Sequence, residues 1–338
     1  MNKRILGRDL EVSSIGLGCM GMSHAYGRPS DKKEAAKLVE AAIDLGCTFF
    51  DTAEVYGTAE EPHHNELLLG EILKPHRNQV KIASKCGLSF DESSGSVNKS
   101  LVPDSRPETI RKSLEGSLKR LQTDHLDLYY IHRVDPTIPI EETAGVMKEL
   151  MEQGKITHWG ISEANASVIR KAHSVCPICA VQNRYSMMYR EYEPLFPLLK
   201  ELQIGFVAFS PLANGFLTCK YNKNSKFEKS TDYRSVMPQF SASGMEANEK
   251  LVSWLQMIAA EKNASPAQIS LAWMFTKNPD LVPIPGTRNI DRLTENMQAV
   301  KVKLTLEEVA EIDDMLNHIP MSEVFGGSKV NASNIVST

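Results

Sequence analysis

The sequence predicts an α/β chain that closes into a (β/α)8 barrel, with long loops over the C-terminal mouth of the barrel. Short apolar runs alternate with helical stretches, and the runs are apolar at nearly every position, as in parallel strands buried on both faces. Right-handed crossovers leave a closed barrel or an open doubly wound sheet as the alternatives. The eight runs are Ser14–Leu17, Cys47–Asp51, Val80–Lys85, Leu126–His132, Thr157–Ile161, Ala180–Asn183, Gly205–Phe209 and Leu281–Pro285.

Chain length favours the closed barrel over the open sheet. The chain has 338 residues, and three stretches have the character of insertions or a tail: Gly87–Arg106, Ala213–Met245 and Asn317–Thr338. Without them the length is close to the roughly 250 residues of one barrel. No linker rich in Pro, Gly or Ser divides the chain, so we expect residues 1–338 to form a single domain.

Capping residues and helical spacing of apolar side chains predict the helices. Asp31–Leu45 follows a polar cap, Pro107–Leu121 has proline in its first turn, and Ile140–Gln153 ends at Gly154. Thr305–Leu316 begins with a capping box, in which a threonine precedes a glutamate by three positions. The other predicted helices are Asn165–His173, Pro194–Leu202 and Pro266–Thr276.

Composition excludes several classes of protein. The chain carries 38 Lys and Arg against 42 Asp and Glu, a net charge of −4, which gives no electrostatic footprint for nucleic acid or for a membrane surface. No apolar run approaches the roughly 20 residues that span a bilayer, and the N-terminus lacks the apolar segment of a signal peptide. We therefore expect a cytoplasmic protein with free thiols. Cys176 and Cys179 form a CxxC, which we interpret as two partly buried thiols in a connector rather than a zinc or redox site.

A glycine motif near the N-terminus has two interpretations. Gly16–Gly21 matches GxGxxG, the fingerprint of dinucleotide-binding open sheets. That fingerprint requires a helix that opens directly on the glycines, but the predicted helix begins about ten residues later. We favour a strand-to-loop connection where the backbone must approach something closely, and keep the open-sheet dehydrogenase as an alternative.

Chemically useful side chains end three successive predicted strands. Asp51, Lys85 and His132 each close an apolar run, and Tyr56 lies in the loop after Asp51. Each has an ordinary structural explanation alone, but strand ends of a barrel converge on one mouth. Lys85 beside Asp51 would form the pairing that buried charges need, and an ammonium near Tyr56 would lower the phenol pKa from about 10. Such a phenol is a general acid suited to a carbonyl oxygen, which His132 would orient.

With these residues in place, the sequence resembles the aldo-keto reductase family, in particular its bacterial and plant members. The resemblance runs in order along nearly the whole chain, which makes it specific. It rests on Gly16–Gly21, DTAEVYG at 51–57, ASK at 83–85, YYIHR at 129–133, GIS at 160–162, Gln182, FSPLANGFL at 209–217, PIPGTR at 283–288, and Arg292 with Glu295 and Asn296. It implies a (β/α)8 barrel that uses NADPH, with Asp51, Tyr56, Lys85 and His132 as the catalytic tetrad.

The resemblance also implies a cofactor site. Ser162 and Gln182 correspond to the pair that holds the nicotinamide carboxamide, and Thr287, Arg288 and Arg292 to the site of the 2′-phosphate. An arginine forks phosphate well, so we expect NADPH to be preferred over NADH. The implied cofactor residues are Gly18, Cys19, Met20, Asp51, Ser162, Gln182, Phe209, Ser210, Pro211, Leu212, Asn214, Gly215, Leu217, Gly286, Thr287, Arg288, Arg292, Glu295 and Asn296.

Two positions depart from the family pattern. Phe209 stands where many relatives place a tyrosine that stacks on the nicotinamide, so a ring face is kept and a hydroxyl is lost. Glu163 stands where many relatives have asparagine, and an ionised acid donates no hydrogen bond.

The expected activity is hydride transfer from NADPH to a small aldehyde or ketone, with Tyr56 supplying the proton. The residues expected at the substrate are Met22, Tyr56, Tyr130, His132 and Phe216. The alternative from another class is an NADPH-binding regulatory or partner subunit with little turnover. The sequence assigns neither the physiological carbonyl compound nor the oligomeric state, and we expect no metal in the site.

Overall fold

Eight parallel strands form one sheet in this computed structural model, which describes residues 2–58, 60–90 and 101–324. Neighbouring strands follow the order β12-β11-β10-β9-β8-β5-β4-β3, and every pair is parallel. Each strand overlaps one of the eight predicted apolar runs. The strands are β3 (Leu17–Gly18), β4 (Phe49–Asp51), β5 (Lys81–Cys86), β8 (Leu128–Ile131), β9 (Trp159–Ser162), β10 (Ala180–Arg184), β11 (Gly205–Phe209) and β12 (Leu281–Pro283).

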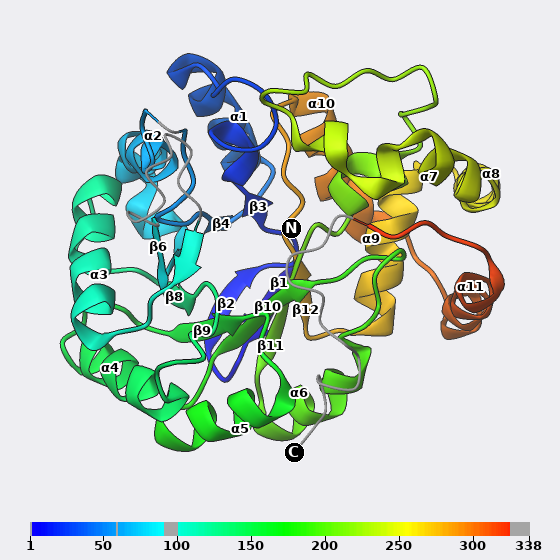
Figure 1. Cartoon of the computed structure of the whole chain (residues 1–338). Helices are drawn as coiled ribbons and strands as arrows, with labels where there is room; N and C mark the ends of the chain where they lie inside the picture. The colour runs from blue at the N-terminus through cyan, green and yellow to red at the C-terminus, as the bar shows by residue number, and fades with distance from the viewer. Residues whose placement is uncertain (1, 59, 91–100, 325–338) are drawn as a thin grey trace.

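Helices surround these strands, one after each strand, as Figure 1 shows. The helices of the ring are α1 (Lys32–Asp44), α2 (His64–Leu73), α3 (Pro107–Leu121), α4 (Ile140–Glu152), α5 (Ala166–Val175), α6 (Phe196–Leu202), α9 (Pro266–Lys277) and α10 (Ile290–Met297). All seven predicted helices are present, and the last, α11 (Leu306–His318), has the expected capping box between Thr305 and Glu308. The predicted (β/α)8 barrel is therefore confirmed.

Glycines join the two ends of the sheet. The Gly16 amide donates to the Pro283 carbonyl over 3.0 Å, so β12 meets the segment that leads into β3. A Cβ atom on Gly18 would lie 2.6 Å from the Ile284 carbonyl oxygen, closer than side chains tolerate. Because α1 begins only at Lys32, these glycines close the barrel and do not open a helix. The open-sheet alternative is wrong, and the expected close backbone approach is confirmed.

An N-terminal hairpin packs into the barrel interior from the end opposite the mouth. Its antiparallel strands are β1 (Lys3–Leu6) and β2 (Leu10–Ser13), which the sequence analysis did not predict. Leu6 and Leu10 join the apolar cluster inside the barrel, together with Phe49 from β4. A second, larger core lies between the strands and the helices, so the strands are buried on both faces.

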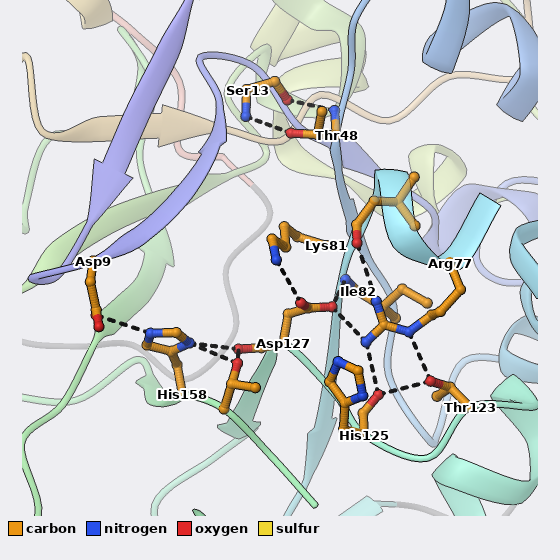
Figure 2. Close-up of polar contacts among 12 residues, drawn as sticks. Asp9, Ser13, Thr48, Arg77, Lys81, Ile82, Thr123, His125, Asp127 and His158 are labelled. Carbon is orange, nitrogen blue, oxygen red and sulfur yellow. Dashed lines mark hydrogen bonds and ion pairs between the residues drawn. The ribbon is translucent and has the colours of Figure 1, made fainter. Parts of the chain in front are cut away.

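Polar contacts tie this hairpin to the N-terminal ends of the strands, as Figure 2 shows. His158 joins Asp9 of the hairpin turn to the Asp127 carbonyl, each over 3.1 Å. The buried Asp127 carboxylate receives Arg77 over 2.9 Å and Lys81 over 3.2 Å. Charge pairing here stabilises the end of the barrel away from the predicted chemistry.

Both predicted insertions contribute residues to the C-terminal mouth, whereas the predicted tail begins in a helix that packs against α9. The first predicted insertion holds a hairpin of β6 (Leu88–Phe90) and β7 (Leu101–Pro103), and its residues 91–100 fall outside the described part. The second holds three short 3₁₀ helices and most of α7 (Ala242–Ala247), and α8 (Glu249–Glu261) follows it. The predicted tail begins within α11 and is described as far as residue 324. Among the described helices, none is long and apolar enough to cross a membrane.

Candidate active site

A cavity of about 460 Å³ opens at the C-terminal ends of the strands. Its wall includes most of the residues that the sequence analysis placed at the catalytic and cofactor sites. These are Gly18, Met20, Asp51, Tyr56, His132, Ser162, Gln182, Phe209, Ser210, Pro211, Leu212, Asn214, Gly215, Gly286, Thr287, Arg288, Arg292, Glu295 and Asn296. Segments far apart in the chain thus meet at one mouth, as parallel barrel strands require.

Asp51 and Lys85 form a buried ion pair beside this wall. Lys85 Nζ lies 2.5 Å from Asp51 Oδ1 and donates to the Thr52 carbonyl over 2.7 Å. Gln182 donates to the second carboxylate oxygen of Asp51 over 2.7 Å, which joins β10 to β4 across the mouth. Burial alone would lower the pKa of Lys85, but the charges of Asp51 and Tyr56 outweigh it and raise that pKa. Lys85 is therefore a fixed cation.

Tyr56 lies directly against this cation. Lys85 Nζ is 5.0 Å from the centre of the Tyr56 ring, and the ring remains partly exposed to the cavity. Burial raises the pKa of Tyr56, and the nearby Lys85 offsets only part of that rise. The expected lowering of the phenol pKa below its ordinary value is thus wrong for the free protein. What Lys85 does is keep the phenol pKa lower than burial alone would set it.

His132 meets the edge of the same ring. The Tyr56 and His132 ring centres are 5.7 Å apart and their planes are at 82°. Burial, then the charges of Arg133 and Lys85, hold the pKa of His132 well below its ordinary value, so the imidazole is neutral at neutral pH. Its buried Nδ1 has no hydrogen-bond partner among the described residues. A neutral imidazole and a phenol that keeps its proton can both donate to one oxygen atom in the cavity.

Glu163, which stands where many relatives have asparagine, pairs with Arg133. Its φ of +54° is held by a hydrogen bond from its amide to Asn183 Oδ1 over 2.7 Å. Its carboxylate lies 3.2 Å from Arg133 Nε, while Arg133 Nη1 donates to the His132 carbonyl over 2.6 Å. Arg133 is on the cavity wall, whereas its partner Glu163 is not.

The far end of the cavity contains Arg288 and Arg292. Arg288 donates to the Arg28 carbonyl over 2.6 Å and also to the Tyr26 carbonyl. Arg292 Nη1 lies 3.5 Å from the Tyr221 hydroxyl, a weak contact that leaves its guanidinium accessible. Arg288, although on the cavity wall as expected, is thus engaged by backbone, whereas Arg292 is the better placed of the two for an anion.

Two loops meet over the cavity in what we call the clasp, defined as Ala25–Gly27 with Thr231–Tyr233. An antiparallel bridge pairs Tyr26 with Asp232, and the Tyr233 amide donates to the Ala25 carbonyl over 2.9 Å. The Gly27 amide donates to the Thr231 carbonyl over 2.9 Å, and Asn214 donates to the Tyr26 hydroxyl over 2.8 Å. The β3–α1 loop and the second predicted insertion are therefore joined across the mouth.

Five residues that the sequence places at the cofactor or substrate lie off the cavity wall, so their predicted contacts stay predictions. Cys19, Met22 and Leu217 are buried in the core between strands and helices. Tyr130 belongs to the cluster inside the barrel, because side chains alternate across a strand and its neighbours in β8 point outward. Phe216 packs on Phe240, with ring centres 5.6 Å apart.

Several residues on the cavity wall were not predicted as site residues from the sequence. Arg133 follows His132 at the same strand end, and Arg184 is two positions after Gln182 on the same face of β10, so both had a positional signal. The Arg184 guanidinium lies 5.4 Å from the centre of the Phe209 ring. His24 and Tyr26 lie on a loop, where strand spacing gives no signal.

The described residues show neither a disulfide at the CxxC nor a metal-binding cluster. Cys176 and Cys179 are free and buried between α5 and β10, which confirms the interpretation as connector thiols. Within the described ranges, no group of three or more His, Cys, Asp or Glu side chains is arranged to hold a metal ion.

Comparisons with known proteins agree with this geometry. A profile of the aldo/keto reductase family matches residues 14–317. A curated protein of Glycine max, named probable aldo-keto reductase 1, is 39% identical over 323 residues, which covers 95% of this chain and 89% of that protein. The solved structure of a glycerol dehydrogenase from Gluconobacter oxydans matches with a TM-score of 0.83 at 27% identity, over 97% of this chain and 98% of that one. An aldo-keto reductase from Bacillus halodurans, solved in its holo form, matches with a TM-score of 0.75 at 26% identity, over 98% and 100% of the two chains.

Proposed function

Because the chain belongs to the aldo/keto reductase family, we propose that it reduces aldehydes or ketones to alcohols with NADPH, and that Tyr56 is the proton donor. The family makes it an oxidoreductase of carbonyl compounds that uses a nicotinamide cofactor. The choice of NADPH and the roles of individual residues are our proposal. The observation that supports them best is the meeting of Tyr56 with Lys85 and His132 at one wall of the cavity.

The cavity fits a nicotinamide cofactor in its chemistry. Ser162 and Gln182 offer hydrogen bonds near the catalytic group, and Phe209 offers a ring face for stacking. At the other end Arg292 offers a guanidinium for a phosphate, beside Asn296. Asn214 and Gly215, both on the cavity wall, have φ values of +60° and +96°, a left-handed backbone that glycine adopts freely and asparagine tolerates. When bound, the cofactor supplies a hydride to the carbonyl carbon.

The protein's own residues polarise the carbonyl group and supply the proton. The carbonyl oxygen lies between the Tyr56 hydroxyl and the His132 ring, and both donate to it. As negative charge develops on that oxygen, the Tyr56 proton moves to it. Lys85, fixed by Asp51, stabilises the phenolate that remains. Positioning and electrostatic stabilisation, rather than a covalent intermediate, carry the catalysis.

Preference for NADPH is proposed on the arginines at the far end. The 2′-phosphate distinguishes NADPH from NADH, and Arg292 is the accessible cation there. Because Arg288 already binds the carbonyl groups of Tyr26, in the clasp, and of Arg28, just after it, we assign Arg288 a smaller part in that choice.

The test is turnover of para-nitrobenzaldehyde with NADPH, followed by loss of the reduced-nicotinamide absorbance and by identification of the alcohol. We expect NADPH oxidation matched by alcohol formation. Tight NADPH binding without turnover of this aldehyde, or of an aliphatic aldehyde and a ketone run in parallel, would support the regulatory or partner-subunit alternative instead.

A further inference from the structure

His24 makes two separate contacts with the segment that holds Tyr56. Its ring stacks on the Tyr56 ring, with centres 6.2 Å apart and planes at 16°. Its Nδ1 lies 2.8 Å from the carbonyl oxygen of Gly57, the residue after Tyr56. One contact acts on the side chain and the other on the backbone, so together they restrict both the ring and the chain that bears it.

We propose that His24 is a positioning residue for Tyr56, and that it couples the closed clasp to the placement of the proton donor. This inference rests on the proposed function, because it concerns the residue to which that function assigns the proton. His24 itself transfers no proton in this account.

The hydrogen bond shows which ring nitrogen of His24 faces Gly57 as a donor. A carbonyl oxygen only accepts, so Nδ1 must donate and carries the proton. That bond fixes the ring plane, and the ring plane lies almost parallel to that of Tyr56. With His132 at an edge of the phenol ring and Lys85 near it, Tyr56 is held by three neighbours.

The clasp connects directly to this arrangement. His24 precedes Ala25, whose carbonyl accepts from the Tyr233 amide over 2.9 Å. The Tyr233 ring meets the His24 ring edge-on, with centres 5.6 Å apart at 76°. When the two loops separate, His24 loses this contact, and the chain that holds it is released. The closed clasp therefore favours the Tyr56 position in which Lys85 and His132 both reach it.

The consequence for catalysis follows from geometry. A displacement of a catalytic group by about 1 Å costs roughly 10²-fold in rate. Loss of His24 should therefore lower kcat and leave the far end of the cavity unchanged. Where its burial is unchanged, a Tyr56 ring farther from Lys85 should also titrate at higher pH, because less positive charge reaches the phenol.

Three substitutions separate the two contacts. His24→Asn keeps a donor near the Nδ1 position and loses the ring, whereas His24→Phe keeps the ring and loses the donor. His24→Ala loses both. We expect Asn and Phe each to lower kcat by roughly 10-fold and Ala by roughly 10²-fold, with the Kd of NADPH changed by less than about 3-fold. A kcat that is higher in His24→Asn and His24→Phe than in His24→Ala indicates that each contact contributes. A general loss of fold would not separate the variants in this way.

The link to the clasp is tested by a double-mutant cycle. Tyr233→Ala should lower kcat when it is introduced into the wild-type protein. It should have little further effect on kcat when it is introduced into His24→Ala. Additive losses would overturn the coupling. Equal kcat in the wild type and His24→Ala would overturn the positioning role.

A second readout does not depend on turnover. Tyrosine labelled at Cζ gives one NMR signal per residue, and the Tyr56→Phe protein identifies the signal of Tyr56. We expect this signal to titrate at higher pH in His24→Phe, which keeps the stacked ring and with it the burial of Tyr56, than in the wild type, and an unchanged titration would contradict the inference. Absence of NADPH-dependent turnover in the wild type, with the expected NMR shift, would count against the proposed function alone.

Discussion

Gln182 and Asp51 lie on opposite sides of the barrel mouth, and Gln182 Nε2 donates to Asp51 Oδ2 over 2.7 Å. The other oxygen of Asp51 holds Lys85 over 2.5 Å. Both carboxylate oxygens are thus occupied, and neither is directed at a substrate. Asp51 acts through Lys85, and Lys85 acts on Tyr56.

Removal of the Asp51 charge should destabilise the fold as well as the site. Lys85 is 1% exposed, so Asp51→Asn leaves a buried cation without its counter-ion. Breaking such a pair costs about 3–5 kcal/mol of unfolding free energy. Urea denaturation measures the loss, and the Asp51→Asn/Lys85→Met double variant should recover part of it without recovering activity. A stable Asp51→Asn protein would contradict the importance of the pair.

The two arginines at the far end should differ in how they affect cofactor binding. Arg292→Leu should raise the Kd of NADPH by roughly 10- to 100-fold and leave that of NADH unchanged, because only the 2′-phosphate is affected. Arg288→Leu releases the Tyr26 and Arg28 carbonyls of the clasp loop, so it should weaken both cofactors by a similar factor. Fluorescence titration gives all four Kd values. A larger loss of NADPH selectivity in Arg288→Leu than in Arg292→Leu would reverse the assignment.

Acid should destabilise the protein through His132. Burial holds its pKa in the folded chain well below the ordinary 6.5, so the unfolded chain binds the proton more readily. Its contribution is complete above about pH 6.5 and is lost as the pH falls below that value, with a slope of at most ~1.4 kcal/mol per pH unit. Unfolding free energies at several pH values should show a shallower slope in His132→Gln. Identical slopes in the two proteins would contradict this.

The barrel seam should be intolerant of a single methyl group. Gly18→Ala places Cβ 2.6 Å from the Ile284 carbonyl oxygen, so the backbone must move, at a cost of roughly 1–3 kcal/mol or more. Gly145→Ala is the matched control, because nothing lies within 4 Å of its Cβ in α4 and the helix gains up to ~1 kcal/mol. Thermal unfolding should shift in opposite directions for the two variants. Equal shifts would indicate that the seam is not tightly closed.

The features that follow from sequence periodicity were the predictable ones. Strand ends on one side of a parallel barrel converge, so Asp51, Lys85 and His132 could be brought together without coordinates. The helix α2 was not predicted because most of its side chains are buried, even that of Glu66. It therefore lacks the polar face by which an amphipathic helix is detected. The N-terminal hairpin escaped because its short strands carry too few residues to show alternation.

Sequence periodicity could not predict the clasp or the direction in which individual side chains point. Arg288 binds the backbone carbonyls of Tyr26 and Arg28. Every residue type has such a carbonyl, so the sequence does not indicate this contact. Tyr130 lies near the end of β8, where a side chain could reach the mouth. The alternation of side chains along the strand instead directs it into the barrel core. The pKa of Tyr56 depends on the balance between burial and the charge of Lys85, which only the three-dimensional arrangement determines.

In the proposed mechanism Tyr56 gives the proton, and Tyr56→Phe is the substitution that isolates this step. The substitution removes one oxygen atom and keeps the ring that His24 and His132 contact. We expect kcat for carbonyl reduction to fall by roughly 10²-fold or more relative to the wild type, while the Kd of NADPH is unchanged. A Tyr56→Phe protein with wild-type kcat would contradict this mechanism.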